Sequence, residues 1–136
     1  SENEIFVMGD PQRLSQVMVN LLSNAIQHTL PDFEITTKIE IENRLTRVSV
    51  TNYGTWIPKE DLERIFDRFY RLERSRNRDQ GGSGLGLSIA RSLINAHGGK
   101  IWAESEQGKS TKFIFTLPML TYYTLAANPV LLKSLN

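Results

Sequence analysis

One stretch of otherwise apolar sequence carries polar side chains at a regular spacing. In "QVMVNLLSNAIQH" they recur every four positions, as Gln16, Asn20, Asn24 and His28. In a helix this spacing places all four on one face. A solvated polar face is the commoner explanation, but asparagine is an indifferent helix former, and two of them within one helix favour a further role. An amide oxygen suits Mg²⁺, which takes its other ligands from water and phosphate.

Glycines at 81, 82, 84 and 86 in "GGSGLGLSIA" stand directly before a second helical pattern. Glycines let backbone N–H groups approach a phosphate at a helix N-terminus, whereas an isolated cluster of this kind is more often a flexible loop. A dinucleotide fingerprint needs a strand just before it, and "RLERSRNRDQ" is not one. The loose Walker A match "AESEQGKST" leads into the strand-like "TKFIFTLP", so we predict a hairpin turn there.

Hydrophobic periodicity predicts the elements that must position these residues. Asp10 caps the first helix and Pro11 fits its first turn, while alternation of Ile35, Ile39 and Ile41 with polar neighbours predicts a hairpin with one buried face. The expected order is helix 9–31, hairpin 35–50, helix 58–72, loop 73–82, helix 83–99, and strands 100–106 and 111–118. This order predicts a two-layer α/β sandwich, with helices on one face of a mixed, largely antiparallel sheet.

The length, net charge and cysteine count are those of an ordinary globular chain. There are 136 residues, a net charge of +1 and no cysteine, so disulfides and thiolate metal sites are excluded and no bulk attraction to nucleic acid or membrane is expected. No apolar run approaches the ~20 residues of a membrane span, and the start lacks a signal-peptide pattern. We expect one domain over 1–118 and a tail of unassigned role over 119–136.

Four segments together resemble a known family. "NLLSNAIQHT", "TNYGTWIP", "IFDRFYRLE" and "GGSGLGLSIA", in this order, are similar to the N, G1, F and G2 boxes of the catalytic ATP-binding domain of sensor histidine kinases. That domain has the Bergerat fold, which gyrase-type and Hsp90-type ATPases share. The resemblance runs from about Asp10 to Pro118, and four ordered motifs are far more specific than any one of them.

The resemblance implies a role for each matching residue. Asn24 would be the Mg²⁺ ligand, and Asn20 stands where the ATPase relatives carry a glutamate that activates water. Arg71 would contact phosphate in an arginine-rich lid over 68–80, with Phe66 and Phe69 packed beneath, and Asn52 and Thr111 would lie near adenine. Arg71 and Asn20 are the catalytic candidates. The remaining nucleotide-binding candidates are Gln27, His28, Gly54, Ile57, Tyr70, Gly82, Ser83, Gly84, Leu85, Gly86 and Leu87.

Four positions depart from the family pattern. Gln27 replaces a common basic residue, and Ser110 replaces a glycine in the last turn. Asn52 replaces the usual aspartate; its oxygen can still accept from the adenine amino group, and its NH₂ can donate to N1. Trp56 stands where a glycine is usual, and its ring points either onto the nucleotide or out onto the lid.

The resemblance implies a kinase module that uses ATP and Mg²⁺. Its γ-phosphoryl acceptor is a histidine on a separate dimerisation domain, its further partner a response regulator, and the full-length protein a homodimer. It would be the cytoplasmic part of a membrane-anchored bacterial sensor, without direct membrane or nucleic-acid contact. The alternatives are a degenerate nucleotide-binding or docking module, an anti-sigma-type serine kinase, and a gyrase-like ATPase, against which Asn20 argues because an amide is a poor general base.

Overall fold

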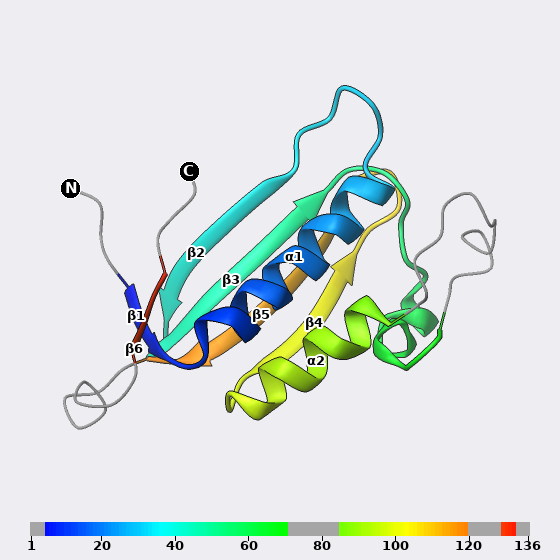
Figure 1. The fold of residues 1–136 in the computed structure, drawn as a ribbon. Helices are drawn as coiled ribbons and strands as arrows, with labels where there is room; N and C mark the ends of the chain where they lie inside the picture. Colours follow the sequence, from blue (N-terminus) through cyan, green and yellow to red (C-terminus); the bar gives the residue numbers. More distant parts are fainter. Residues whose placement is uncertain (1–4, 71–84, 120–128, 133–136) are drawn as a thin grey trace.

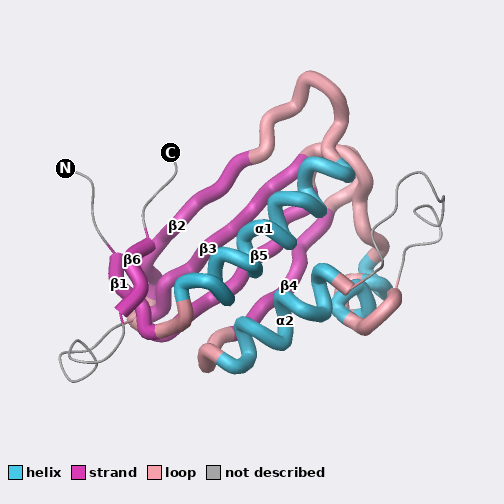
Figure 2. Tube along the Cα trace, in the orientation of Figure 1, coloured by secondary structure: helices cyan, strands magenta, loops and turns pink. Residues whose placement is uncertain are grey.

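Residues 5–70, 85–119 and 129–132 are described by the computed structural model. The main sheet has four strands in the order β2-β3-β5-β4, and every neighbouring pair is antiparallel. Its strands are β2 (Thr36–Glu42), β3 (Leu45–Asn52), β4 (Lys100–Ser105) and β5 (Thr111–Pro118). Two α-helices, α1 (Pro11–His28) and α2 (Gly86–Ala96), lie on one face of this sheet (Figures 1 and 2). The predicted two-layer α/β fold is confirmed, with an antiparallel rather than mixed sheet.

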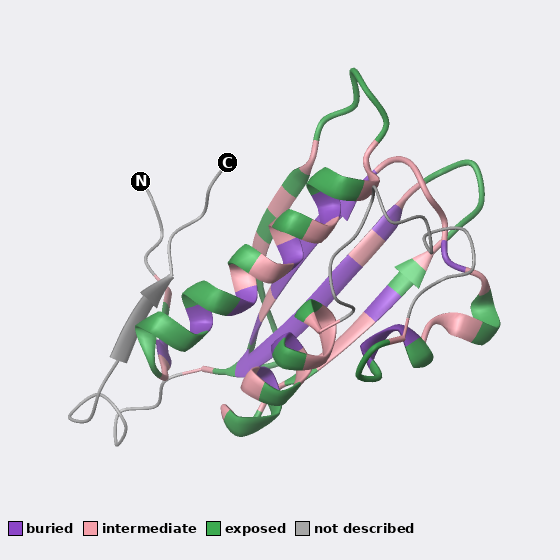
Figure 3. Ribbon diagram, turned by 45° about the vertical axis from the view of Figure 1, so that its right-hand side comes forward, coloured by how far each residue is buried: buried purple, intermediate pink, exposed green. Residues whose placement is uncertain are grey.

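The core lies between the helices and the sheet. Each element turns its buried side inward, and the buried stripes of α1, β3 and β5 face one another (Figure 3). α1 buries Leu14, Val17, Leu21 and Ala25. These positions follow the helical period, so the hydrophobic pattern that predicts the helix also directs its packing.

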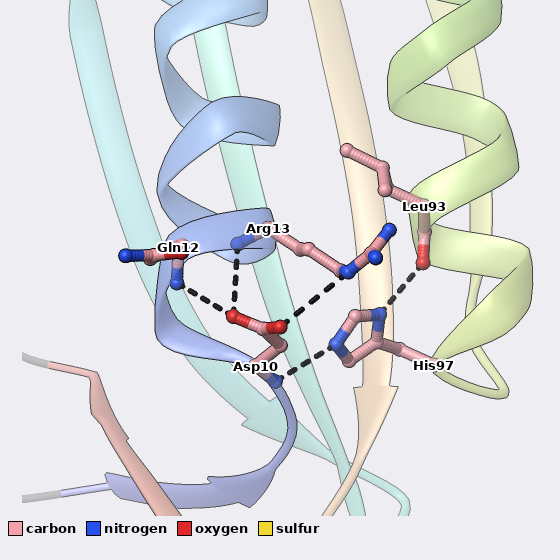
Figure 4. A network of polar contacts seen from close by, with 5 residues as sticks. All are labelled: Asp10, Gln12, Arg13, Leu93 and His97. Carbon is pink, nitrogen blue, oxygen red and sulfur yellow. Dashed lines mark hydrogen bonds and ion pairs between the residues drawn. The ribbon is translucent and has the colours of Figure 1, made fainter.

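The first turn of α1 is capped as predicted. The Asp10 carboxylate accepts hydrogen bonds from the backbone N–H groups of Gln12 and Arg13, at 2.9 and 3.3 Å (Figure 4). His97, at the end of α2, accepts a hydrogen bond from the Asp10 N–H at Nε2 (3.1 Å), and its Nδ1 lies 2.7 Å from the Leu93 carbonyl oxygen. Because that oxygen is only an acceptor, Nδ1 carries the hydrogen. The capping residue Asp10 therefore also links the start of α1 to the end of α2 through its hydrogen bond to His97.

The predicted hairpin is formed by β2 and β3 and turns at Asn43 and Arg44. Both residues have positive φ, 51° and 63°, which is the two-residue turn that matches strand twist. The predicted burial holds only in part. Ile39 packs against the core, but Ile41, two residues further along the edge strand β2, is 53% exposed.

The predicted helix over 58–72 is wrong for its described part. The chain forms two short 3₁₀ turns, η1 (Lys59–Asp61) and η2 (Arg64–Phe66). Ile65 and Phe66 enter the core from η2, and the backbone then turns at Phe69, which has φ 66°. A stretch this short does not repay helix nucleation when its apolar side chains bind the core directly. Phe66 is 3% exposed and Phe69 is 60% exposed. Their predicted packing beneath the lid involves residues outside the described ones and stays a prediction.

A second, two-stranded sheet joins the two ends of the described chain, and the sequence pattern did not reveal it. β1 (Ile5–Met8) pairs antiparallel with β6 (Pro129–Leu132), and Val7 also bridges Met119 just past β5. Val7 is fully buried. The tail thus contributes a strand at the sheet end opposite the carboxyl end of α1 (Figure 1).

Candidate nucleotide-binding site

A row of three polar side chains closes the core at one end of the sheet. Asn52 ends β3, Thr111 begins β5 and Ser105 ends β4, and Thr111 is the register partner of both others. The preceding row is apolar and consists of Val50, Phe113 and Ala103. Because strand side chains alternate between faces, the polar row points to the same helix-covered side as the apolar one.

Asn52 is buried, and its amide nitrogen is unpaired. The residue is 1% exposed, and Nδ2 has no hydrogen-bond partner among the described residues. An unpaired buried donor costs on the order of 1–3 kcal/mol, and native proteins keep few of them. A ligand atom that accepts from Nδ2 would remove this cost, so Asn52 is suited to recognising an acceptor.

A hydrogen-bonded chain connects the polar row to the loop that follows β3. The Ile57 N–H donates to Ser105 Oγ at 2.8 Å, Ser105 Oγ lies 2.7 Å from Thr111 Oγ1, and Thr111 Oγ1 donates to the Thr55 carbonyl oxygen at 3.1 Å. The loop on both sides of Trp56 is therefore attached to β4 and β5. Ile57 is also 6% exposed, which fixes the loop from its apolar side.

The same loop touches the end of α1 backbone to backbone. The Thr55 N–H donates to the His28 carbonyl oxygen at 3.3 Å, and the Leu30 N–H donates to the Tyr53 carbonyl oxygen at 2.8 Å. A Cβ atom on Gly54 would lie 2.0 Å from the His28 oxygen. Glycine is required here for close approach, because no side chain fits between the two backbones.

The amides of α1 extend from this point toward the start of α2. Asn20 Nδ2 donates to the Gly86 carbonyl oxygen at 3.0 Å, and Asn20 Oδ1 accepts from Gln16 Nε2 at 2.6 Å. Asn24 lies one turn further along and is half-buried, and its side chain makes no hydrogen bond within the described part of the chain. The predicted polar face is thus present, and Asn20 links it to the helix that follows the glycines.

His28 is half-buried at the end of this face, and burial lowers its pKa below the ordinary value of 6.5. The folded protein therefore favours neutral His28, and its stability should be complete above pH 6.5 and decrease as the pH falls through 6.5 toward the folded-state pKa. The slope from one such group is at most about 1.4 kcal/mol per pH unit. Denaturant unfolding of wild type and His28→Gln from pH 7.5 to 5.5 should show a steeper loss in wild type. Parallel curves for the two proteins would contradict this expectation.

The structure brings some of the predicted site residues together and leaves others apart. Asn20 meets Gly86, Asn52 pairs with Thr111, and Gly54 meets His28, while Leu85 and Leu87 lie at the start of α2. Gln27 is exposed. Tyr70 is half-buried and its hydroxyl donates to Asp61, which holds it against the η turns. The predicted residues Arg71, Gly82, Ser83 and Gly84 lie outside the described residues, as does loop 73–82.

Two residues of this site were not predicted from the sequence. Ser105 and Thr55 both take part in the hydrogen-bonded chain. Ser105 lies outside the four family segments, and Thr55 lies within "TNYGTWIP" but has no role that the resemblance implies. The predicted strands 100–106 and 111–118 would place Glu106 opposite Thr111, whereas in the structure the turn is one residue longer and Ser105 stands opposite Thr111. The predicted register therefore did not indicate Ser105. No pattern around Thr55 indicates that its carbonyl oxygen, rather than its side chain, makes the contact.

Comparison with known proteins assigns the chain to a class. Residues 9–121 match the family model described as histidine kinase-, DNA gyrase B-, and HSP90-like ATPase. The chain belongs to this family. Among the described residues, no helix has the length and hydropathy that a bilayer crossing requires.

Particular relatives narrow the class to sensor kinases. The chain is 43% identical over 119 residues to the sensor histidine kinase WalK of Bacillus subtilis, covering 86% of this chain and 20% of that protein. It therefore spans about a fifth of this curated relative. Its fold is similar to that of the mycobacterial sensor histidine kinase MprB, with a TM-score of 0.76 and 27% identity over 83% of this chain and 76% of that one. It is also similar to the histidine kinase ThkA in complex with the response regulator TrrA, with a TM-score of 0.68 and 38% identity over 84% of this chain and 30% of that one.

Proposed function

We propose that this chain is the catalytic domain of a sensor histidine kinase, which binds Mg²⁺-ATP and presents the γ-phosphoryl group to a histidine on a separate helical domain. The observation that carries the proposal is the buried polar row at the end of the sheet, where Asn52 holds an unpaired donor beside Thr111. Adenine offers an acceptor, N1, next to its amino donor, so a base that enters this row satisfies the amide.

The phosphate end of the site would lie along α1 and the start of α2. No group of three or more His, Cys, Asp or Glu side chains within the described ranges is placed to hold a metal ion. The donors here are amides, and this set fits a Mg²⁺ that is bound mainly through phosphate, with Asn24 supplying one oxygen. When bound, the metal supplies charge neutralisation of the phosphates. Arg71 and the glycines at 82 and 84 remain proposed phosphate contacts.

Asn20 favours transfer of the phosphoryl group over hydrolysis. Both ends of its amide are engaged, by Gln16 and by the Gly86 carbonyl, and an amide does not accept a proton at neutral pH. No base at this position would activate water. The bond between Pγ and the bridging oxygen then breaks as the unprotonated nitrogen of the acceptor imidazole bonds to phosphorus. ADP leaves with the bond's electron pair, and the imidazole releases its remaining N–H proton to solvent water.

The rest of the full-length protein is proposed by analogy with the relatives. The partners would be the protein's own dimerisation and phosphoacceptor domain and a response regulator, in a homodimer whose catalytic part lies in the cytoplasm and whose anchor lies in the membrane. Within this chain we propose residues 1–118 as the catalytic domain. The tail, 119–136, would add an edge strand through β6.

Titration with a fluorescent ATP analogue, with Mg²⁺ and with EDTA, tests the proposal. We expect binding with a Kd between micromolar and millimolar in Mg²⁺, and displacement by ATP. Phosphotransfer in trans to a helical domain from a close relative tests the reaction. Absence of Mg²⁺-dependent binding would refute the proposal, and binding without transfer would favour the degenerate module instead.

A further inference from the structure

We propose that Ser105 is a positioning residue for base recognition: its hydroxyl holds the loop around Trp56 in place and keeps the Thr111 hydroxyl turned so that it can only accept a hydrogen bond from a bound base. This inference rests on the proposed nucleotide site and identifies a determinant of its specificity. Three described contacts carry it, all at the closed end of the sheet.

The direction of each hydrogen bond in the chain follows from valence. A backbone N–H only donates and a carbonyl oxygen only accepts, so Ser105 accepts from Ile57 and Thr111 donates to Thr55. Thr111 has one hydroxyl hydrogen, and it is committed to Thr55. The 2.7 Å contact between the two hydroxyls is therefore donated by Ser105. The sequence of donors is Ile57 N–H, Ser105 Oγ–H, Thr111 Oγ1–H, and it ends at the Thr55 carbonyl oxygen.

This order gives the polar row a fixed polarity. Thr111 has no hydrogen left for a ligand and offers only a lone pair, while the unpaired Asn52 Nδ2 offers a hydrogen. A base edge with a donor next to an acceptor fits this arrangement, and the amino group and N1 of adenine are such an edge. Guanine presents a carbonyl oxygen in place of the amino group, so its lone pairs would face that of Thr111.

Removing the Ser105 hydroxyl breaks two links of the chain at once. The backbone N–H of the buried Ile57 loses its acceptor, Ser105 Oγ. Thr111 Oγ1 loses the hydrogen bond that it accepts from the Ser105 hydroxyl. Of the loop's two described side-chain hydrogen bonds to β4 and β5, only the one from Thr111 to Thr55 then remains. A Ser105→Thr substitution keeps a hydroxyl at the same position, so it should restore what Ser105→Ala loses.

The test compares ATP with GTP. Competition against the fluorescent analogue in Mg²⁺ should show that Ser105→Ala weakens ATP on the order of three- to tenfold, with GTP changed much less, so that the ATP-to-GTP preference falls. Hydrogen exchange should show faster exchange at the Ile57 amide in Ser105→Ala. Ser105→Thr should return both measurements toward the wild-type values.

Ser49→Ala is the matched control, because Ser49 is a buried β3 serine on the opposite face of the sheet. It should leave the preference and the Ile57 exchange rate unchanged. An unchanged ATP affinity in Ser105→Ala, or an equal loss for ATP and GTP, would overturn the inference. If wild type itself fails to bind ATP, the proposed function fails first, and the exchange rate at Ile57 still decides whether the hydroxyl chain holds the loop.

Discussion

Asn24→Ala should lower the affinity for ATP in Mg²⁺ by about 10- to 100-fold, and should change the much weaker binding in EDTA little. Loss of even an outer-shell partner of a metal costs a factor of this size, so loss of a direct oxygen ligand should cost at least as much. Asn24 lies on the polar face of α1, one turn beyond Asn20, at the position proposed to meet the metal and the phosphates. The measurement is analogue titration of both proteins with and without Mg²⁺.

Ser23→Ala provides the control for this experiment. Ser23 is the adjacent residue of α1 but is exposed on another face of the helix, so its removal should leave Mg²⁺-dependent binding intact. Thermal unfolding of both variants shows whether the helix is preserved. If Mg²⁺ strengthens ATP binding by the same factor in Asn24→Ala as in wild type, Asn24 is not the metal ligand.

Gly54→Ala should be the most destabilising single substitution in the loop, at about 3 kcal/mol or more. The added Cβ would lie 2.0 Å from the His28 carbonyl oxygen, so the loop and the end of α1 must separate. That movement would break the backbone hydrogen bonds that join them, including the 2.8 Å bond from the Leu30 N–H to the Tyr53 carbonyl oxygen. The free energy of unfolding would then fall both because the site is overpacked and because polar backbone groups lose their partners. Denaturant unfolding measures the loss of stability, and ATP affinity should fall with it.

Gly108→Asn is a useful comparison for Gly54→Ala. Gly108 has φ 77° and no atom within 4 Å of a Cβ built on it, and asparagine tolerates that backbone conformation. The free energy of unfolding of Gly108→Asn should therefore differ little from that of wild type. Equal stability of Gly54→Ala and wild type would show that the loop does not depend on this close approach.

The elements predicted well are those whose pattern and packing agree. α1 carries a cap, a proline in its first turn and a buried stripe, so local and tertiary signals coincide from Asp10 to His28. The polar face of that helix was visible for the same reason. Asn52 and Thr111 were predicted through the family resemblance, and their register across β3 and β5 places them side by side.

The misses have physical causes as well. Segment 58–72 carries helix-forming residues, but Ile65 and Phe66 enter the core from a short 3₁₀ turn, and tertiary packing overrides propensity. β1 and β6 are four residues each and lie at opposite ends of the chain, so no local sequence pattern predicts their pairing. Ser105 gains its partners only after β4 and β5 align, and a serine in a strand carries little signal alone.

The outer face of the sheet has a practical consequence for spectroscopy. Ile114 is fully buried on that face, where its register partner Trp102 lies beside it and Arg47 lies over the indole ring at 5.5 Å from the centroid. The chain has two tryptophans, and the other, Trp56, belongs to the loop beside the polar row. Intrinsic fluorescence therefore combines one emitter remote from the proposed nucleotide site with one in the loop beside it. In a Trp102→Phe protein the whole signal would come from Trp56, and quenching on addition of ATP would report directly on where that ring points.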